Sequence, residues 1–497
     1  MKYLIIHILC SVISVMLFLI AADAEYRRVC YYSNWSQYRP GRASFKPKDI
    51  NPSLCTHLVY AFARLSGNGL ATLEWNDAQF YKIFNGLKTT YPGLRTLIAA
   101  GGWNEGSVRF STIVSLAENR REFASNTVQF IRQYGFDGFD IDWEYPVSRG
   151  GSPSDYQNFI LLLQELRQMF EEEAVRTGKE RLLLTAAVAA GKNTIDVSYD
   201  IPGMARYMDF ISLMSYDLHG GWETIIGHNS PLYKRSGEHG DLAYLNVQAA
   251  ANYWITKGCP SKKLIIGLPT YGRSFTLADP NKWHMGAPAS GVGPAGPYTR
   301  EAGVLSYYEV CEIIASGRGK RYWNLEQMVP YYVQGTTWVG YDDEESFTVK
   351  LKWIKENDYG GAMIWNLDLD DFNGSFCSGP PYPLTRLLNE YLTDDSGSTT
   401  ETTTPKTTRT RLSKTTPFTT RRTTDPAERM TARGTTTSTQ TNTGFCRGKS
   451  DGLHPDPTNC VHFYNCFRGR GSRITCPTGT LFNRDRSYCD WPYNVKC

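Results

Sequence analysis

The chain has 497 residues, which is enough for one large domain and one or more smaller units. Its 53 basic and 49 acidic side chains leave a formal net charge of +4, so the composition gives no indication of a nucleic-acid-binding surface. The 12 tryptophans and 31 tyrosines fit either a large aromatic core or a binding site for sugars, whose rings have flat apolar faces.

The first 24 residues are predicted to form a secretory signal peptide. Lys2 provides a basic start, residues 4–20 are apolar, and residues 22–24 (Ala-Asp-Ala) form a cleavage site of the small-x-small type. The apolar run is short for a membrane span, and the sequence contains no second candidate. We therefore expect a secreted, extracellular protein that keeps its disulfides and has no membrane contact after signal cleavage.

Short apolar segments follow the signal and alternate with segments of helical periodicity. The clearest helical segment covers residues 156–174, where large apolar side chains recur at helical spacing. The segments typical of strands are residues 28–32, 57–62, 94–101, 138–142, 181–188, 210–214, 264–268 and 361–365. Such an alternation predicts an α/β fold, the eight-stranded parallel (β/α)8 barrel or TIM barrel. In that fold the catalytic groups lie at the carboxyl ends of the strands.

The fourth of these segments is acidic, with Asp137, Asp140, Asp142 and Glu144 inside residues 137–144. Because side chains alternate between the two faces of a strand, Asp140, Asp142 and Glu144 are expected on one face. Three neighbouring carboxylates repel one another, so at least one should hold a proton near neutral pH. A solvated strand edge or a divalent-cation site is the alternative, but the intervening residues are aromatic or branched and no calcium-loop spacing is present. The cluster therefore indicates a functional site.

The interval between the seventh and eighth strand segments is much longer than one helix. Residues 274–337 contain Gly/Pro turns and Tyr-rich pieces, and they are predicted to form an inserted α+β subdomain at one side of the cleft. Residues 394–444 are dominated by Thr, Ser and Pro, with too few apolar side chains to form a core. In a secreted protein this composition is typical of an O-glycosylated extended linker, and an undecorated disordered tail is the alternative.

The remaining residues, 445–497, form a small unit rich in cysteine. So short a unit needs covalent staples, and three disulfides among its six cysteines would supply them, although spacing alone does not choose the pairing. The chain has 12 cysteines, and loss of Cys10 with the signal leaves 11, an odd number. One thiol should therefore stay unpaired.

Residues 26 to about 393 resemble a chitinase of glycoside hydrolase family 18, of the secreted animal type. The resemblance rests on the Asp-x-x-Asp-x-Asp-x-Glu signature at residues 137–144, followed by Tyr145-Pro146. Residues 101–104 (GGWN), 214–217 (MSYD), 268–273 (LPTYGR) and 361–365 (GAMIW) agree with it. The six-cysteine tail is similar to the peritrophin-A type chitin-binding module. The implied layout is a catalytic barrel at 25–393, a linker at 394–444 and a binding module at 445–497.

This resemblance implies an endo-acting chitinase that hydrolyses β-1,4-linked N-acetylglucosamine polymers by a retaining, substrate-assisted mechanism. The module would anchor the enzyme to insoluble chitin. The implied partners are chitin and chito-oligosaccharides, without nucleic acid, metal or cofactor, and the protein is expected to be a monomer. A non-catalytic chitin-binding lectin or a chitin-matrix protein is the alternative, against which the intact Glu144 and the complete signature argue.

The resemblance also assigns roles to residues. Glu144 would be the general acid, with a pKa raised by Asp140 and Asp142. Asp142 would orient the acetamido N–H of the substrate, Asp140 would share the proton of Asp142, and Tyr216 and Asp217 would complete the catalytic set. Residues implied at the sugar-contacting surface are Tyr31, Trp35, Glu74, Trp75, Gly101, Gly102, Trp103, Asn104, Tyr145, Met214, Tyr216, Asp217, Trp222, Tyr271, Arg273 and Trp365. Trp35 and Trp222 could instead be buried core residues.

Disulfides follow from the same resemblance and not from the spacing. They would join Cys30 to Cys55, Cys311 to Cys377, Cys446 to Cys466, Cys460 to Cys497, and Cys476 to Cys489, which leaves Cys259 free. Two cleft residues depart from the family pattern: Glu105 stands where an aromatic is frequent, and Asn366 where a small residue is usual.

Overall fold

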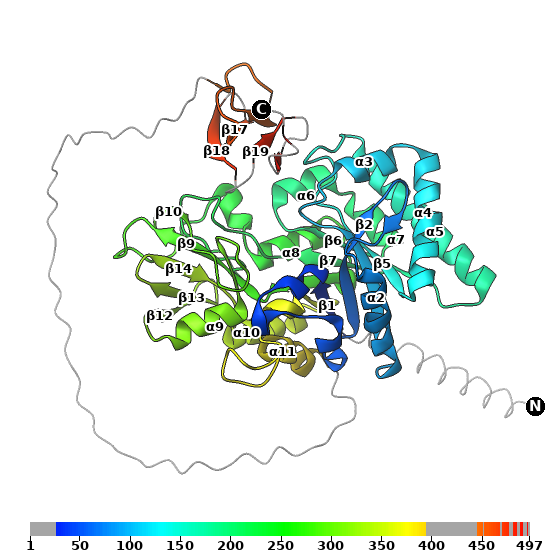
Figure 1. The fold of residues 1–497 in the computed structure, drawn as a ribbon, viewed down its shortest axis with the longest axis horizontal. Helices are drawn as coiled ribbons and strands as arrows, with labels where there is room; N and C mark the ends of the chain where they lie inside the picture. Colours follow the sequence, from blue (N-terminus) through cyan, green and yellow to red (C-terminus); the bar gives the residue numbers. More distant parts are fainter. Residues whose placement is uncertain are drawn as a thin grey trace, which may run out of the picture. The chain divides into compact units, whose positions relative to one another are not determined.

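The structure is a computed structural model that describes residues 26–393, 445–450, 452–467, 470–476, 481–484, 488–490 and 495. The predicted signal peptide and linker lie outside these residues. The chain divides into two compact units, residues 1–400 and 401–497, which are drawn in Figure 1 and are described separately. Within the described part of the chain, no helix is both long and apolar enough to cross a membrane.

The first unit is built on a closed barrel of eight parallel strands. In chain order these are β1 (Arg27–Ser33), β2 (His57–Leu65), β4 (Arg95–Gly101), β5 (Gly138–Asp142), β6 (Leu183–Ala189), β7 (Phe210–Met214), β8 (Leu264–Pro269) and β15 (Gly361–Trp365). Each strand pairs with the next, and β15 pairs with β1 to close the barrel. The predicted TIM barrel is confirmed, and every predicted segment overlaps one of these strands.

Helices lie around the barrel (Figure 1). They are α2 (Asp77–Gly86), α3 (Val108–Ser115), α4 (Ala117–Tyr134), α5 (Asp155–Thr177), α6 (Lys192–Ser198), α7 (Ile201–Tyr207), α8 (Val247–Thr256), α10 (Glu344–Glu356) and α11 (Pro383–Leu392). The longest is α5, which contains the helix predicted at 156–174. Its apolar stripe is buried, with Phe159, Leu162, Leu163, Leu166 and Phe170 in the main core. Burial of such a stripe fixes which face of the helix meets the barrel.

An antiparallel sheet with one helix interrupts the barrel between β8 and α10. It consists of β9 (Tyr271–Leu277), β10 (Ala289–Val292), β11 (Val304–Ser306), β12 (Lys320–Asn324), β13 (Val329–Gln334) and β14 (Thr337–Gly340), with α9 (Tyr307–Ala315). Figure 1 shows this sheet to one side of the barrel. Because β9 begins only two residues after β8 ends, its first side chains lie close to the carboxyl ends of the barrel strands.

Two disulfides fix long-range contacts in the first unit. Cys30 on β1 is bonded to Cys55, and Cys311 on α9 is bonded to Cys377, which are the pairings that the family resemblance implies. Cys259 is free and buried, and burial raises the pKa of its thiol to about 12. The protonated thiol at that site is a poor nucleophile at neutral pH.

The second unit is small and built from short strands. β16 (Gly452–Pro455), β17 (His462–Phe467) and β18 (Arg470–Thr475) form an antiparallel sheet, and β19 (Leu481–Asn483) pairs with β20 (Tyr488–Asp490). A disulfide joins Cys446 to Cys466. Cys460 and Cys476 are also disulfide-bonded. Cys497, the expected partner of Cys460, lies outside the described residues.

Candidate active site

The acidic side chains lie at the carboxyl end of β5, where the sequence predicts them. Asp140 is fully buried; its Oδ2 accepts a hydrogen bond from the Tyr31 hydroxyl on β1 at 2.7 Å, and its Oδ1 accepts one from the Thr185 hydroxyl on β6 at 2.5 Å. Asp142 is also buried, but its Oδ1 has no hydrogen-bond partner. Glu144 follows two residues after the strand and is half-buried. The site therefore contains one satisfied carboxylate and one buried oxygen that can still accept a hydrogen bond.

Asp137 lies at the opposite end of β5. The Lys88 ammonium contacts its two carboxylate oxygens at 2.9 and 2.8 Å, and the backbone N–H of Thr96 donates to its Oδ2 at 2.8 Å. These contacts connect β4 and β5 to the turn that follows α2. Asp137 thus has a structural role at the start of β5, and the other three acidic residues belong to the site.

Burial is the main electrostatic influence on the three carboxyl groups. It raises the pKa of Asp140 to about 6, against the hydrogen bonds from Thr185 and Tyr31 that lower it. It also raises the pKa of Asp142 well above its usual range, and the charges of Glu144 and then Asp140 add to that shift. Buried carboxyl groups prefer the neutral form because low-dielectric surroundings disfavour charge.

The pKa of Glu144 is raised to about 7. Burial is the largest cause; Tyr145 and Arg149 oppose it, and the charge of Asp217 adds to it. The direction that the sequence predicts is therefore right, but its cause was wrong: repulsion from Asp140 and Asp142 is not the main reason. Acidic neighbours act more strongly on Asp142, which lies between the other two.

Tyr216 and Asp217 follow the end of β7. Tyr216 is buried inside the barrel, and its hydroxyl contacts the Met363 Sδ at 3.6 Å. Asp217 has a φ of 55°, a conformation that is uncommon for a residue other than glycine. Its Oδ1 accepts hydrogen bonds from the Tyr271 hydroxyl and the Arg273 Nε of β9, each at 2.7 Å. The structure thus brings together four of the predicted site residues, two from the segment after β7 and two from β9.

Gly101 and Gly102 pass closely over the end of β5. Their φ values are 121° and 82°, and the Gly102 N–H donates to the Asp142 carbonyl oxygen at 2.8 Å. A Cβ on Gly101 would overlap that same carbonyl oxygen, and a Cβ on Gly102 would lie 2.7 Å from the Phe62 ring. Glycine is needed at both positions because the backbone has positive φ and no room for a side chain.

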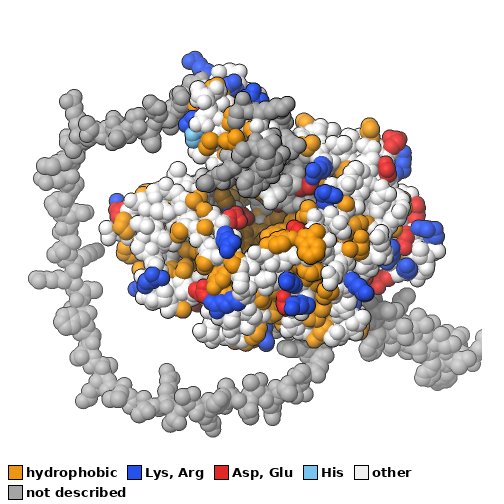
Figure 2. Space-filling model, in the orientation of Figure 1, with side chains coloured by type: hydrophobic (Ala, Val, Ile, Leu, Met, Phe, Trp, Pro, Cys, Tyr) orange, Lys and Arg blue, Asp and Glu red, His pale blue; other side chains and the backbone are white. Residues whose placement is uncertain are grey.

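Aromatic side chains surround the end of β15. The Trp365 ring centroid lies 5.4 Å from that of Tyr31, 6.0 Å from that of Phe62 and 6.2 Å from that of Trp35. Trp35 is 39% exposed and Trp222 is 61% exposed, so neither is a core residue. Figure 2 shows a hollow on the face it presents, with hydrophobic side chains gathered at its edge and charged side chains beside it.

The other predicted contact residues are mostly on the surface of the unit. Trp75 is 83% exposed and Trp103 is 61% exposed, and Asn104 is exposed next to it. Glu74 accepts a hydrogen bond from the Tyr38 hydroxyl at 2.6 Å. The parts of these indoles that stay exposed can stack on a flat ligand, as sugar-binding tryptophans do.

Several residues of the site were missed by the sequence analysis. Arg149 stacks over the Trp103 ring at 3.7 Å and donates to the Glu144 carbonyl oxygen at 3.0 Å. Asn229 accepts a hydrogen bond from the Asp217 N–H at 2.9 Å. Thr185 could have been found, because it occupies an inward position of a predicted strand. Arg149 and Asn229 lie in irregular segments, where no periodicity predicts the direction of a side chain.

The site contains oxygen and aromatic groups, which suit proton transfer and sugar stacking. In the described residues there is no cluster of three or more His, Cys, Asp or Glu side chains arranged to hold a metal ion. A carboxyl group with a pKa near neutrality and a second, buried carboxyl group beside it can act as a proton donor and a charge stabiliser.

Comparison with known proteins identifies the family. Residues 27–370 match the glycosyl hydrolases family 18, and residues 446–497 match the chitin binding peritrophin-A domain. Chitotriosidase-1 of Mus musculus is 44% identical over 463 residues, which are 93% of this chain and 95% of that protein.

Solved structures agree with this assignment. An immunomodulatory active chitinase from Trichuris suis, TsES1, is 47% identical with a TM-score of 0.72, and the match covers 74% of this chain and all of that one. Human YKL-39, described as a pseudo-chitinase with retained chitooligosaccharide binding properties, is 43% identical with a TM-score of 0.71. The match covers 74% of this chain and 99% of the YKL-39 chain. The chain therefore belongs to glycosyl hydrolase family 18 and carries a peritrophin-A chitin-binding domain at residues 446–497.

Proposed function

We propose that this protein is an endo-acting chitinase that cleaves β-1,4-linked N-acetylglucosamine polymers with retention of configuration. The observation that carries the proposal is the arrangement at β5. Glu144 has a pKa of about 7 and can hold a proton at neutral pH, and Asp142 presents a buried oxygen without a partner. Glycoside hydrolysis usually needs two protein carboxyl groups. In the substrate-assisted variant the acetamido group of the sugar is the nucleophile, so the protein supplies a general acid and a second carboxylate that orients this group.

In the first step, Glu144 gives its proton to the glycosidic oxygen as the bond from that oxygen to the anomeric carbon breaks. The acetamido carbonyl oxygen of the same sugar attacks the anomeric carbon and forms a cationic oxazolinium ring. Asp142 accepts a hydrogen bond from the acetamido N–H. Once ionised, it stabilises the positive charge of the oxazolinium ring. Its raised pKa fits this role, since the empty site favours the neutral form and a nearby cation favours the charged form.

In the second step, water attacks the anomeric carbon, and the bond from that carbon to the acetamido oxygen breaks, which opens the oxazolinium ring. Glu144, now a carboxylate, takes a proton from that water, so the acid is restored and the configuration is retained. Tyr216 donates a hydrogen bond to the acetamido oxygen, and Asp140 exchanges a proton with Asp142. Two buried hydroxyl donors hold Asp140 in place, which supports a proton-sharing rather than a substrate-binding role.

The aromatic residues would hold the sugar chain. Trp365 forms the floor beneath the sugar at the cleavage point, and Trp35, Trp103 and Trp222 extend the platform along the cleft. Trp35, Trp103 and Trp222 are exposed and Trp365 is half-buried, and this supports the role because indole rings match the apolar face of a pyranose.

The C-terminal module would attach the enzyme to insoluble chitin. The protein is proposed to be secreted and to act as a monomer on chitin and chito-oligosaccharides, without a nucleic-acid or membrane partner. The signal-like start of the sequence and the disulfides in both units support secretion.

Release of soluble oligomers from chitin tests this function. The wild-type protein is expected to release them, and Glu144→Gln should be at least about a hundredfold slower, because it lacks the proton donor. If both proteins release nothing but bind chitin equally, the protein is a lectin. If both release product equally, Glu144 is not the acid.

A further inference from the structure

A buried ion pair lies behind the site and joins Asp342, just before α10, to Lys350 in the middle of that helix. The Lys350 Nζ donates to Asp342 Oδ2 at 2.8 Å and contacts Asp342 Oδ1 at 2.7 Å, and both side chains are fully buried. The same Nζ donates to the backbone oxygen of Ser230 at 2.6 Å and to its Oγ at 3.0 Å. The ammonium thus meets an acceptor close to it in the chain and another, Ser230, that is 120 residues away from Lys350.

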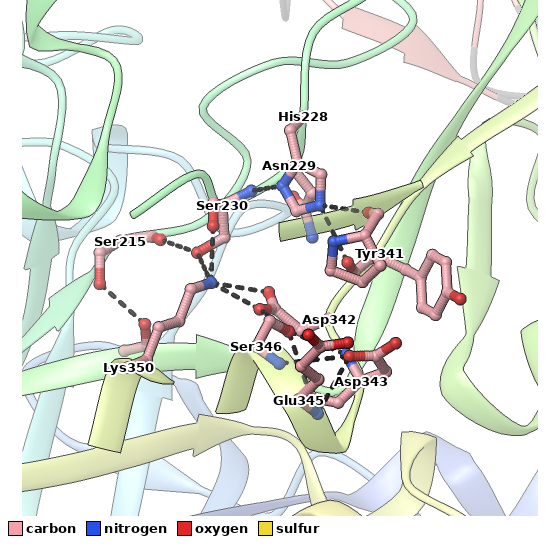
Figure 3. Close-up of polar contacts among 12 residues, drawn as sticks. Ser215, His228, Asn229, Ser230, Tyr341, Asp342, Asp343, Glu345, Ser346 and Lys350 are labelled. Atoms are coloured by element: carbon pink, nitrogen blue, oxygen red, sulfur yellow. Dashed lines mark hydrogen bonds and ion pairs between the residues drawn. The ribbon is translucent and has the colours of Figure 1, made fainter. Parts of the chain in front are cut away.

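Ser230 connects the Lys350 ammonium to the residues of the site. Its hydroxyl donates to the Ser215 carbonyl oxygen at 2.7 Å, directly before Tyr216. Figure 3 shows Ser230 between the Lys350 ammonium and Ser215, with Asp342 on the other side of the ammonium. Asn229 makes the next links: its Oδ1 accepts from the Asp217 N–H at 2.9 Å, and its carbonyl oxygen accepts from the Leu218 N–H at 3.0 Å.

His228 fixes the other side of this three-residue segment. Its Nδ1 accepts the Ser230 N–H at 3.0 Å, so its proton is on Nε2, which faces the Tyr341 and Pro330 carbonyl oxygens at 2.9 and 3.1 Å. Burial lowers the pKa of His228 to about 3, so the ring is neutral at neutral pH. The segment 228–230 is therefore held between the antiparallel sheet and the residues after β7.

The position of Asp217 requires such support. A non-glycine residue at a φ of 55° costs conformational energy and persists where surrounding contacts fix it. A buried ion pair is a weak source of net stability, since desolvation offsets most of the attraction. The specific geometry of Lys350 is thus better explained by the segment that it holds than by stability.

We propose that Lys350 and Asp342 are positioning residues for the reaction. Through Ser230 and Asn229 they hold Tyr216 and Asp217 in the positions needed to contact the substrate's acetamido group. The inference rests on the proposed function, which places Tyr216 and Asp217 at that group. Neither Lys350 nor Asp342 touches the substrate.

The test replaces the pair by apolar residues in the full-length chain, as Lys350→Met with Asp342→Leu. The matched control is Arg132→Met with Glu173→Leu, which removes a pair with contacts of 2.6 and 3.0 Å between α4 and α5. On a soluble chito-oligosaccharide, the first variant is expected to lose roughly ten- to hundredfold in kcat, with KM changed by less than about twofold. The control should stay within about twofold of wild type in both parameters.

Hydrogen exchange provides a readout that does not depend on activity. The backbone amides of Asp217 and Leu218 donate to Asn229. Their hydrogen-exchange rates should increase in the first variant and stay unchanged in the control. If the apolar pair does not fold, Ser230→Ala removes only the hydroxyl link and should give a smaller loss of kcat with the same faster exchange.

The outcomes separate the two proposals. An active wild type beside a folded variant with unchanged kcat would overturn the positioning role, whatever its exchange rates. A loss of kcat shared by the control would overturn it as well. A wild type without activity, tested beside Glu144→Gln, would instead overturn the proposed function.

Discussion

At the scale of single residues, the site depends on which carboxyl groups are neutral. Burial raises the pKa of all three acidic side chains, but only Asp142 has two acidic neighbours among the causes of its shift. The sequence predicts that they lie together, since strand alternation requires it. It does not predict how deeply they are buried, because the depth depends on side chains from other strands, such as Tyr31 and Thr185.

The pH dependence of the reaction should follow Glu144. A general acid is active only while protonated, so kcat/KM is expected to fall as the pH rises through about 7. The Arg149 guanidinium lowers the pKa of Glu144, so Arg149→Met should move this alkaline limb to higher pH. It should also raise KM, because the stacking partner of Trp103 is lost.

A pH profile of kcat/KM for wild type and Arg149→Met checks this prediction. Arg121→Met is a suitable control, because Arg121 is an exposed arginine on α4 whose ion pair is with Glu118. An alkaline limb that stays at the same pH in all three proteins would contradict the electrostatic role of Arg149.

Asp142 should reduce stability at neutral pH. Its pKa is raised in the folded protein, so between its unfolded and folded pKa values the folded state holds a proton that the unfolded state has released. Raising the pH through this window therefore lowers the free energy of unfolding. Asp142→Asn removes the titrating group and is expected to unfold at a higher temperature than wild type at pH 8, by a few degrees, and to lose most activity.

Thermal unfolding at several pH values measures the effect. The advantage of Asp142→Asn should shrink toward about pH 3, below the unfolded-state pKa of about 3.9, where the wild-type carboxyl group is protonated in both states. Asp358→Asn, at an exposed carboxylate, is the control. A variant less stable than wild type at pH 8 would show that the Asp142 charge is stabilised in the fold.

At the scale of elements, the barrel strands were predictable and the irregular segments were not. Strands buried on both faces are nearly continuous apolar runs, and eight such runs point to one architecture. The segment 218–230 has no such pattern. Its place in the fold depends on Lys350, which is 120 residues away from Ser230 in the sequence. Contacts of this kind are decided by packing between elements and leave no local periodicity.

The turn after β4 should tolerate little change. A Cβ on Gly101 would overlap the Asp142 carbonyl oxygen, which accepts the Gly102 N–H. Gly101→Ala must therefore displace the turn from β5, and we expect it to cost about 2 kcal/mol or more and to lower activity. Gly86→Ala, at the end of α2 with nothing within 4 Å of the added Cβ, should be neutral or stabilising by up to about 1 kcal/mol.

Chemical unfolding and oligomer hydrolysis measured on both alanine variants check this contrast. Equal stability of the two variants would mean that the turn can shift without strain. Loss of stability in Gly101→Ala with full activity would mean that the turn supports the fold but not the site.

At the scale of the whole molecule, the chain combines a catalytic unit and a small cystine-containing unit. The sequence predicts both, because the cysteine-rich end and the Thr-rich segment before it differ sharply in composition from the barrel. Two binding elements on one chain raise the effective concentration of each at a surface that both recognise. This advantage exists only on insoluble chitin, where a second attachment point is available.

Deletion of residues 394–497 should therefore affect insoluble chitin and soluble oligomers differently. The truncated protein is expected to adsorb more weakly to insoluble chitin, by about tenfold or more, and to hydrolyse soluble oligomers at a rate within about twofold of wild type. A full-length control that loses only the module's fold, Cys446→Ser with Cys466→Ser, should behave like the truncation because that disulfide closes the small unit. Adsorption isotherms and oligomer kinetics measure both effects. Unchanged adsorption in either variant would place chitin attachment on the barrel alone, where the exposed tryptophans of the cleft would have to supply it.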